Sequence, residues 1–184
     1  MVPSDFFYVE EPTRAGGIRV VPNLEEPQIV FPRGAVVRVD GLMATTPDGE
    51  RFVDRANITL GPITEPIRPV GLTNRSLGGG DLGKPDLGKG QHGVTGGIGT
   101  NNIGLLVRTW GRVIEREPGP LPTWLVIDDG SGTAVKCLVP EGVYIYPSVL
   151  YVTVTGICSM EKEAEVARRA IRIRDGQDIT PYQP

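Results

Sequence analysis

The chain has 184 residues and a formal net charge of −3. Hydrophobic residues make up 39% of it, enough for a folded core, but no apolar run reaches about 18 residues, so we expect no membrane span. One histidine and two cysteines are too few for a structural zinc site, and we expect no metal and no other cofactor. The acidic balance counts against nucleic acid as the main partner, because phosphate contacts require a cationic surface.

Glycine and proline are abundant, with 25 and 17 residues, and they separate runs rich in β-branched residues. This pattern is typical of short strands joined by tight turns. The first residues, Met1-Val2-Pro3-Ser4, show no basic region followed by an apolar one, so no signal peptide is predicted. The sequence is therefore consistent with a cytosolic protein, or with a mature or excised part of a longer one.

An internal repeat organises the chain. Four segments of the first part match four segments of the second part in the same order. The matches are residues 6–11 with 124–129, 17–21 with 134–138, 37–43 with 152–158, and 51–60 with 170–173. Alternation of apolar and polar residues predicts that these segments are strands.

The connections between the predicted strands carry turn signals. Asp48-Gly49, preceded by Pro47, predicts a tight hairpin between residues 36–43 and 51–60. In the second copy, the corresponding residues 160–169 are rich in Glu, Lys, Arg and Ala. They are expected to form either one or two helical turns, with Glu165 and Arg169 spaced i,i+4, or a solvated hairpin end.

The two copies differ at their starts. A good strand, residues 105–114, precedes the second copy, whereas residues 1–5 are too short to supply one for the first. We therefore divide the chain into a first unit of residues 1–61, a Pro/Gly-rich connector of residues 62–104, and a second unit of residues 105–184 that includes a C-terminal tail. Apolar residues within the connector predict that part of it packs on a neighbouring unit. They are Leu77, Leu82, Leu87, Val94 and Ile98.

Three motifs of the second copy carry a resemblance to a known family. They are Val107-x-x-x-Gly111-x-Val113, Leu125-x-Ile127-Asp128-Asp129-Gly130-Ser131-Gly132 and Val152-x-Val154-x-Gly156. Together they resemble the OB-fold, the five-stranded oligonucleotide/oligosaccharide-binding barrel, in its branch that binds single-stranded DNA and tRNA. The resemblance covers residues 105–179, and residues 6–60 in the first copy. The arrangement is also similar to secreted bacterial proteins that string such modules in series.

This resemblance implies an all-β protein with two five-stranded Greek-key barrels in tandem. The first barrel lacks its opening strand, which another segment or another subunit is expected to supply. The helix that often links strands three and four of the family is expected to be a loop at residues 141–148, because Gly142 and Pro147 disfavour it. The resemblance implies a binding or scaffolding module rather than an enzyme, placed outside the cell or at its surface, with the cytoplasm as the alternative.

The parity of the strands predicts one candidate binding surface. Val107, Thr109, Gly111 and Val113 are expected to point inward, so their neighbours point outward. The outward residues mix aromatic and basic types, as a platform for single-stranded nucleic acid requires. They are Arg108, Trp110, Arg112, Trp124 and Lys136, with Phe6, Tyr8 and Arg19 as their counterparts in the first copy. The competing interpretation is that the two tryptophans cover a barrel end or an inter-domain contact.

The remaining chemistry-bearing residues favour structural roles. The pairs Glu10-Glu11 and Asp128-Asp129 suit acid–base chemistry or Ca²⁺ binding, but their recurrence beside tight turns favours turn formation. Cys137 and Cys158 align with the apolar Val20 and Met43, so buried free thiols are expected, with a disulfide between them as the alternative in a secreted protein. His92 lies in the Gly-rich connector, without the partners that a nucleophilic site needs. We expect no catalytic residues.

Two hypotheses about function follow. In the first, the protein is a structural module that associates with copies of itself through β-strand complementation, because a barrel lacking a strand exposes unpaired edges. The missing strand would come from the connector, from the tail at residues 178–184, or from another copy, and the last source would build oligomers or filaments. In the second, the outward aromatic and basic surface binds single-stranded nucleic acid or a glycan. We favour the structural hypothesis.

Overall fold

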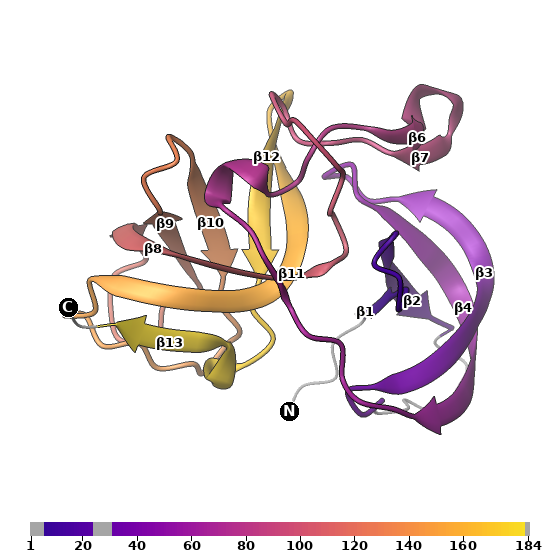
Figure 1. Cartoon of the computed structure of the whole chain (residues 1–184), viewed down its shortest axis with the longest axis horizontal. Coiled ribbons are helices and arrows are strands. Elements are labelled where there is room, and N and C mark those ends of the chain that lie inside the picture. The colour runs from indigo at the N-terminus through magenta and orange to yellow at the C-terminus, as the bar shows by residue number, and fades with distance from the viewer. Residues whose placement is uncertain (1–5, 24–30, 183–184) are drawn as a thin grey trace.

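The computed structural model describes residues 6–23 and 31–182, and the protein is all-β throughout this part (Figure 1). Helix is limited there to three short 3₁₀ turns, Asn74–Ser76, Pro85–Leu87 and Gly176–Asp178. No helix in these residues is long and apolar enough to cross a membrane. The strands are β1 (Phe7–Glu10), β2 (Gly17–Pro22), β3 (Ala35–Thr45), β4 (Arg51–Ile63), β5 (Val70–Gly71), β6 (Leu82–Lys84), β7 (Lys89–Gln91), β8 (Leu106–Arg116), β9 (Trp124–Asp128), β10 (Ala134–Leu138), β11 (Tyr151–Glu163), β12 (Val166–Arg172) and β13 (Ile179–Tyr182).

The first half of the chain forms a four-stranded sheet in the order β1-β2-β4-β3. β2 runs parallel to β4, and the other two pairings are antiparallel. The hairpin predicted at Asp48-Gly49 joins β3 to β4, and Gly49 adopts the positive φ of 93° that favours glycine in such a turn. In Figure 1 the long strands β3 and β4 curve around β1 and β2.

The second half forms a larger sheet. Five of its strands each pair with two other strands of the same five. β8 pairs with β9 and β11, β9 with β10, β10 with β12 in parallel, and β12 with β11. The short strands β5 and β13 add to β8 and β11 respectively. Residues 160–169 form a hairpin end, the second of the two expected alternatives, and residues 141–148 form a loop without a helix, as expected.

The strand pairings confirm the alignment of the repeat. In both halves an antiparallel hairpin is followed by a parallel pairing and a second antiparallel hairpin, and equivalent residues occupy equivalent positions of the register. The equivalent pairs are Phe7–Val20 and Leu125–Cys137, Val20–Val53 and Cys137–Ile171, and Met43–Val53 and Cys158–Ile171. The first sheet therefore has the strand order of the second without an equivalent of β8.

The main hydrophobic core lies within the second half. Alternate residues of β8, β9 and β10 point into it, which confirms the predicted parity, and Val107, Leu125 and Ile127 are fully buried. By contrast, Val20 and Ala56 are the fully buried apolar residues of the first sheet as far as it is described. Burial of apolar surface is the main source of folding free energy, so most of the stability resides in the second half.

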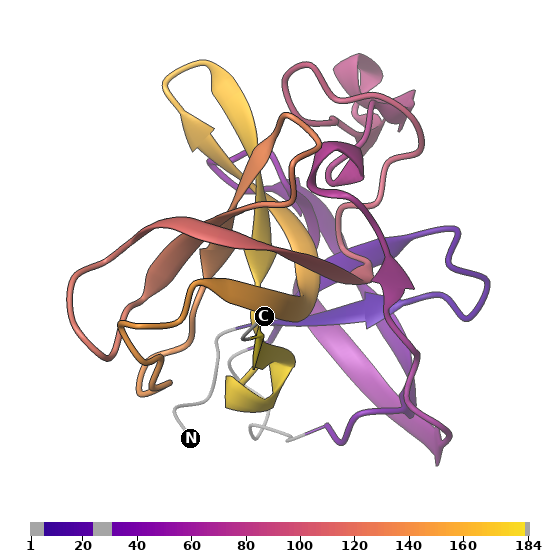
Figure 2. The same cartoon turned by 60° about the vertical axis from the view of Figure 1, so that its left-hand side comes forward.

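The connector packs on the second half through some of its apolar residues, as expected. Leu77 is fully buried in the main core, and Val94 joins a smaller cluster with Ile103 and Met160. The expected packing is not observed for Leu82 and Leu87, which are exposed on the β6–β7 hairpin. This hairpin projects from the body of the molecule beyond the β3–β4 turn (Figures 1 and 2).

The two halves meet through polar contacts. Glu50, at the end of the β3–β4 turn, is almost fully buried, and its Oε2 accepts a 2.7 Å hydrogen bond from Ser159 Oγ on β11. Arg172 on β12 donates from Nε to the same serine at 3.0 Å. Nearer to β1, Glu10 Oε2 accepts the Leu106 N–H at 2.8 Å. A buried carboxylate that loses its donors destabilises a fold, so these bonds fix how the halves meet.

Candidate assembly site

The first sheet has an open strand position between β1 and β3, where β8 lies in the second half. β9 and β11, the counterparts of β1 and β3, are joined there through β8. β1 pairs with β2 alone and β3 pairs with β4 alone among the described residues. One edge of each strand therefore presents main-chain N–H and C=O groups that can accept another strand.

Side chains that face this position are apolar and exposed. Directly opposed residues of a sheet lie on the same face, so Met43 faces inward with Val53, and Leu60 faces inward with Val37. Met43 is 52% exposed and Leu60 is 50% exposed. Cys158, the counterpart of Met43, is fully buried in the second half, where its Sγ accepts the Gly78 N–H of the connector at 3.3 Å. The two halves thus share the inward pattern, but the inward side chain is buried only in the second half.

Two of the three expected sources for a covering strand are engaged elsewhere. The connector strand β5 pairs with β8, and β6 and β7 pair with each other. The tail strand β13 pairs with β11 through Ile179–Tyr182. The expectation that the connector or the tail completes the first sheet is therefore wrong for the part of the chain that the structure describes.

The proposed binding residues on β8 do form an outward row. Arg108, Trp110 and Arg112 alternate with buried residues, and the Trp110 side chain is 56% exposed. Arg108 Nε donates to Thr155 Oγ1 on β11 at 2.9 Å. This row has the mixture of ring and cation that stacking on bases requires.

Trp124 and Lys136 do not join that row. Trp124 sits beside Glu117, the residue after β8, whose N–H donates to the Trp124 carbonyl, and Glu117 lies seven residues beyond Trp110. At about 3.3 Å per residue this is a separation of roughly 23 Å along the chain, so the expected single surface is divided. Lys136 lies near the Trp124 ring and is paired with Glu161 at 2.9 Å.

Phe6, Tyr8 and Arg19 lie at the junction of the two halves, not on an open surface. The Arg19 guanidinium stacks 3.5 Å from the Phe6 ring centroid, and Arg172 of the second half lies 5.8 Å from it. Burial raises the pKa of the Tyr8 hydroxyl, and the nearby Glu50 carboxylate raises it further. Their parity was predicted correctly, but they lie against Arg172 of β12 and Ser159 of β11. Phe6 and Tyr8 thus occupy a contact between the halves, which the competing interpretation had assigned to the two tryptophans.

The expected alternative of a disulfide between Cys137 and Cys158 is wrong. Both thiols are free and buried. Ile171 of β12 pairs with Cys137 on one side and with Cys158 on the other, so a whole strand separates the two cysteines. Two strand spacings amount to about 9.6 Å between Cα atoms, beyond the reach of a disulfide. Burial raises the pKa of the Cys158 thiol to about 12, which keeps it in the unreactive protonated form.

The acidic pair of the second half serves turn geometry, as expected. Asp128 Oδ1 accepts the Gly130 N–H and Asp129 Oδ1 accepts the Ser131 N–H. Asp129 Oδ2 also accepts the Asn74 N–H at 2.8 Å, which ties the connector to this turn. Partial burial acts to raise the pKa of Asp129, but these hydrogen bonds outweigh it and hold the pKa below its usual value.

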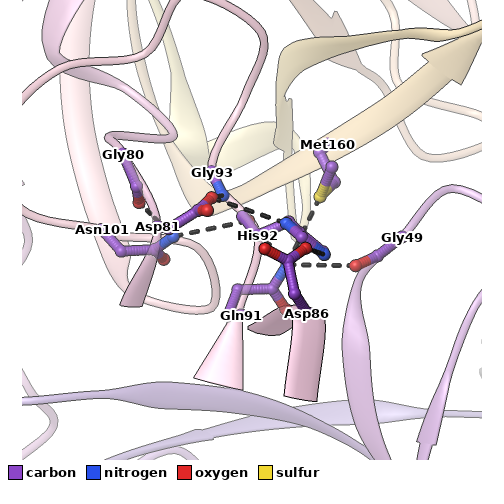
Figure 3. A network of polar contacts seen from close by, with 9 residues as sticks. All are labelled: Gly49, Gly80, Asp81, Asp86, Gln91, His92, Gly93, Asn101 and Met160. Carbon is purple, nitrogen blue, oxygen red and sulfur yellow. Dashed lines mark hydrogen bonds and ion pairs between the residues drawn. The ribbon is translucent and has the colours of Figure 1, made fainter. Parts of the chain in front are cut away.

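His92 belongs to a polar network around the β6–β7 hairpin (Figure 3). Its Nδ1 lies 3.6 Å from Asp81 Oδ1, and its Nε2 lies 3.7 Å from Asp86 Oδ1. The neighbouring Gln91 donates from Nε2 to the Gly49 carbonyl at 3.1 Å, which holds the hairpin against the β3–β4 turn. Within residues 6–23 and 31–182, no group of three or more His, Cys, Asp or Glu side chains is arranged to hold a metal ion.

Across residues 6–23 and 31–182, the geometry defines an all-β protein with two sheets of related strand order, one of which has an open strand position. A scan of protein-family models finds no match to this sequence, and searches of curated proteins and of solved structures find none either.

Proposed function

We propose that both sheets are OB-type modules, and that the first is one strand short. The proposal is supported by the strand order β8-β9-β10-β12-β11 with a return pairing to β8 and one parallel contact between the third and fifth strands. The same order without its first member describes the first sheet. A Greek-key barrel of five strands has this arrangement.

On this basis the protein is a non-enzymatic assembly module that receives a β-strand from a second copy of the chain. The observation that carries the proposal is the open strand position, where two edges have no partner strand among the described residues and the inward side chains of Met43 and Leu60 are exposed. Strand addition satisfies the main-chain groups and buries the apolar face in one step. Because donor and acceptor surfaces differ, the contact is head-to-tail and propagates into oligomers or filaments.

Sedimentation velocity over a wide range of protein concentration tests the proposal. The expected result is a mass that grows with concentration, with extended particles visible by electron microscopy at the upper end. A protein that stays monomeric at the highest soluble concentration would overturn it.

A peptide competitor tests the site itself. A synthetic peptide with the sequence of residues 105–116, which contains the strand β8 that fills the equivalent position of the second half, is expected to bind and to shift the assemblies toward monomer. A scrambled peptide of the same composition is the control. If both peptides act alike, the assembly does not proceed through strand addition.

A second candidate function is binding of single-stranded nucleic acid along β8. It is favoured by the exposed Trp110 between Arg108 and Arg112. Titration with an oligonucleotide at low salt is expected to quench tryptophan fluorescence, and added salt is expected to reverse the quenching. Quenching by an oligosaccharide that is insensitive to salt would assign the surface to glycans instead. No quenching by either ligand would exclude this function.

A further inference from the structure

A pocket of about 450 Å³ lies where the connector crosses the second half. Three arginines line it, each from a different part of the chain: Arg33 before β3, Arg108 on β8, and Arg174 after β12. Pro66, Ile67 and Pro69 of the connector form an apolar side of the same pocket. The chain as a whole is acidic, so this concentration of guanidinium groups is a local property of the fold.

Two of these arginines are held in place by carboxylates. Arg174 makes two hydrogen bonds of 2.7 Å to the two carboxylate oxygens of Asp178, which is 7% exposed on its side chain. Arg33 forms an ion pair with Asp175. A guanidinium carries five N–H donors, so one carboxylate partner leaves donors available on each.

Arg108 is not paired with a carboxylate of any described residue. Its Nε donates to Thr155 Oγ1, and no acidic side chain of the described residues forms an ion pair with it. The hydroxyls of Thr153, Thr155 and Thr180 line the pocket around it, together with the Gln177 side chain. The pocket therefore contains many donors, and among the described residues that line it Asp178, already bound to Arg174, is the one carboxylate.

We propose that this pocket binds a tetrahedral oxyanion, the phosphate or sulfate group of a small ligand, with Arg108 as the principal contact. The donors converge from several strands and from both halves, which suits four oxygens arranged in three dimensions better than the two oxygens of a flat carboxylate. Charge-assisted hydrogen bonds from arginine to phosphate are among the strongest in proteins. The volume exceeds that of the anion alone, so the apolar side at Pro66 and Ile67 is available to the organic part of a phosphate ester.

Isothermal titration calorimetry with sodium phosphate in a low-salt buffer tests the inference. The wild-type protein is expected to bind phosphate saturably and more tightly than acetate. Arg108→Gln is expected to weaken phosphate binding by at least about tenfold, because it removes a charged donor. Arg75→Gln is the matched control, since Arg75 is exposed, does not line the pocket and does not belong to the outward row of β8.

The comparison of ligands and variants separates the outcomes. Tighter binding of glucose 6-phosphate than of phosphate would identify a phosphate ester as the ligand, and equal binding would identify the free anion; both support the inference. No saturable binding of either, acetate binding as tight as phosphate, or an equal loss in both glutamine variants would overturn it. Arg108→Lys, which keeps the charge, provides a second variant with intermediate affinity expected, should Arg108→Gln fail to fold.

Discussion

Gly17 on β2 and Gly104, two residues before β8, bring their main chains into direct contact. A Cβ atom on Gly17 would lie 2.2 Å from the Gly104 carbonyl oxygen, and a Cβ on Gly104 would lie 2.4 Å from the Gly17 carbonyl oxygen. Neither position can accept a side chain unless the two halves separate. This contact, together with the bond between Ser159 and Glu50, sets the distance between the first sheet and the second half.

Gly17→Ala is expected to destabilise the protein by about 1–3 kcal/mol, the range for overpacking a well-packed site. Its neighbour Gly16 has no atom within 4 Å of an added Cβ, so Gly16→Ala is the matched control and is expected to unfold like the wild type. Urea unfolding measures both. Equal stability of the two variants would show that the halves do not meet at this glycine pair.

Met43→Glu is expected to abolish assembly without unfolding the monomer. Met43 is half-exposed in the isolated chain, so a carboxylate remains solvated there. A strand added at the open strand position would bury that charge without a partner, which is costly. Sedimentation velocity and circular dichroism measure the two effects.

The control for this variant is Leu121→Glu. Leu121 has a similar exposure of 54% and lies outside the first sheet, between β8 and β9. Assembly that persists in Met43→Glu, or that is lost equally in Leu121→Glu, would contradict the assembly site.

Asp129→Asn is expected to reduce stability near pH 7 by up to about 1 kcal/mol, a small figure because the carboxylate is partly solvated. The pKa of Asp129 is lower in the folded state than its ordinary value of 3.8, so the wild type binds fewer protons when folded than when unfolded. The stabilising contribution is therefore present above about pH 4 and is lost as the pH falls through the folded pKa. The difference between variant and wild type should shrink in that window, as measured by urea unfolding at several pH values.

Neither cysteine is expected to react with a thiol reagent in the native protein, because both are buried and burial raises the pKa of both thiols. In denaturant without reductant, both thiols should react, giving two per chain. A result of zero in denaturant would mean that the disulfide forms after all.

Sequence reasoning predicted the local structure well where the pattern is short-range. Alternation identified the repeated strands and β8, though not the short strands β5, β6, β7 and β13, and Asp48-Gly49 identified the β3–β4 turn. The parity of β8 was also correct, because successive side chains of a strand point to opposite faces whatever the fold. The sequence predicted the candidate site only in part. The repeat indicated that the first half lacks one strand, but it did not indicate which side chains are exposed there.

The sequence did not predict which segments far apart along the chain come into contact. Phe6 and Tyr8 have the same outward parity as Trp124, yet Arg172 and Ser159 of the other half lie against them. The pocket arginines Arg33 and Arg174 lie far apart along the chain and carry no shared motif, so no local signal could have grouped them.

By itself the sequence determined that the protein is all-β and that its two halves repeat one strand order, because periodicity, turn residues and self-similarity are local properties of the chain. Only the tertiary structure decided where the connector and the tail pair, which outward residues remain accessible, and that a strand separates Cys137 from Cys158. Those outcomes depend on which strand edges and sheet faces meet in space, because backbone hydrogen bonding and burial act across the whole fold. In the second half β8 fills a strand position that no described strand fills in the first half.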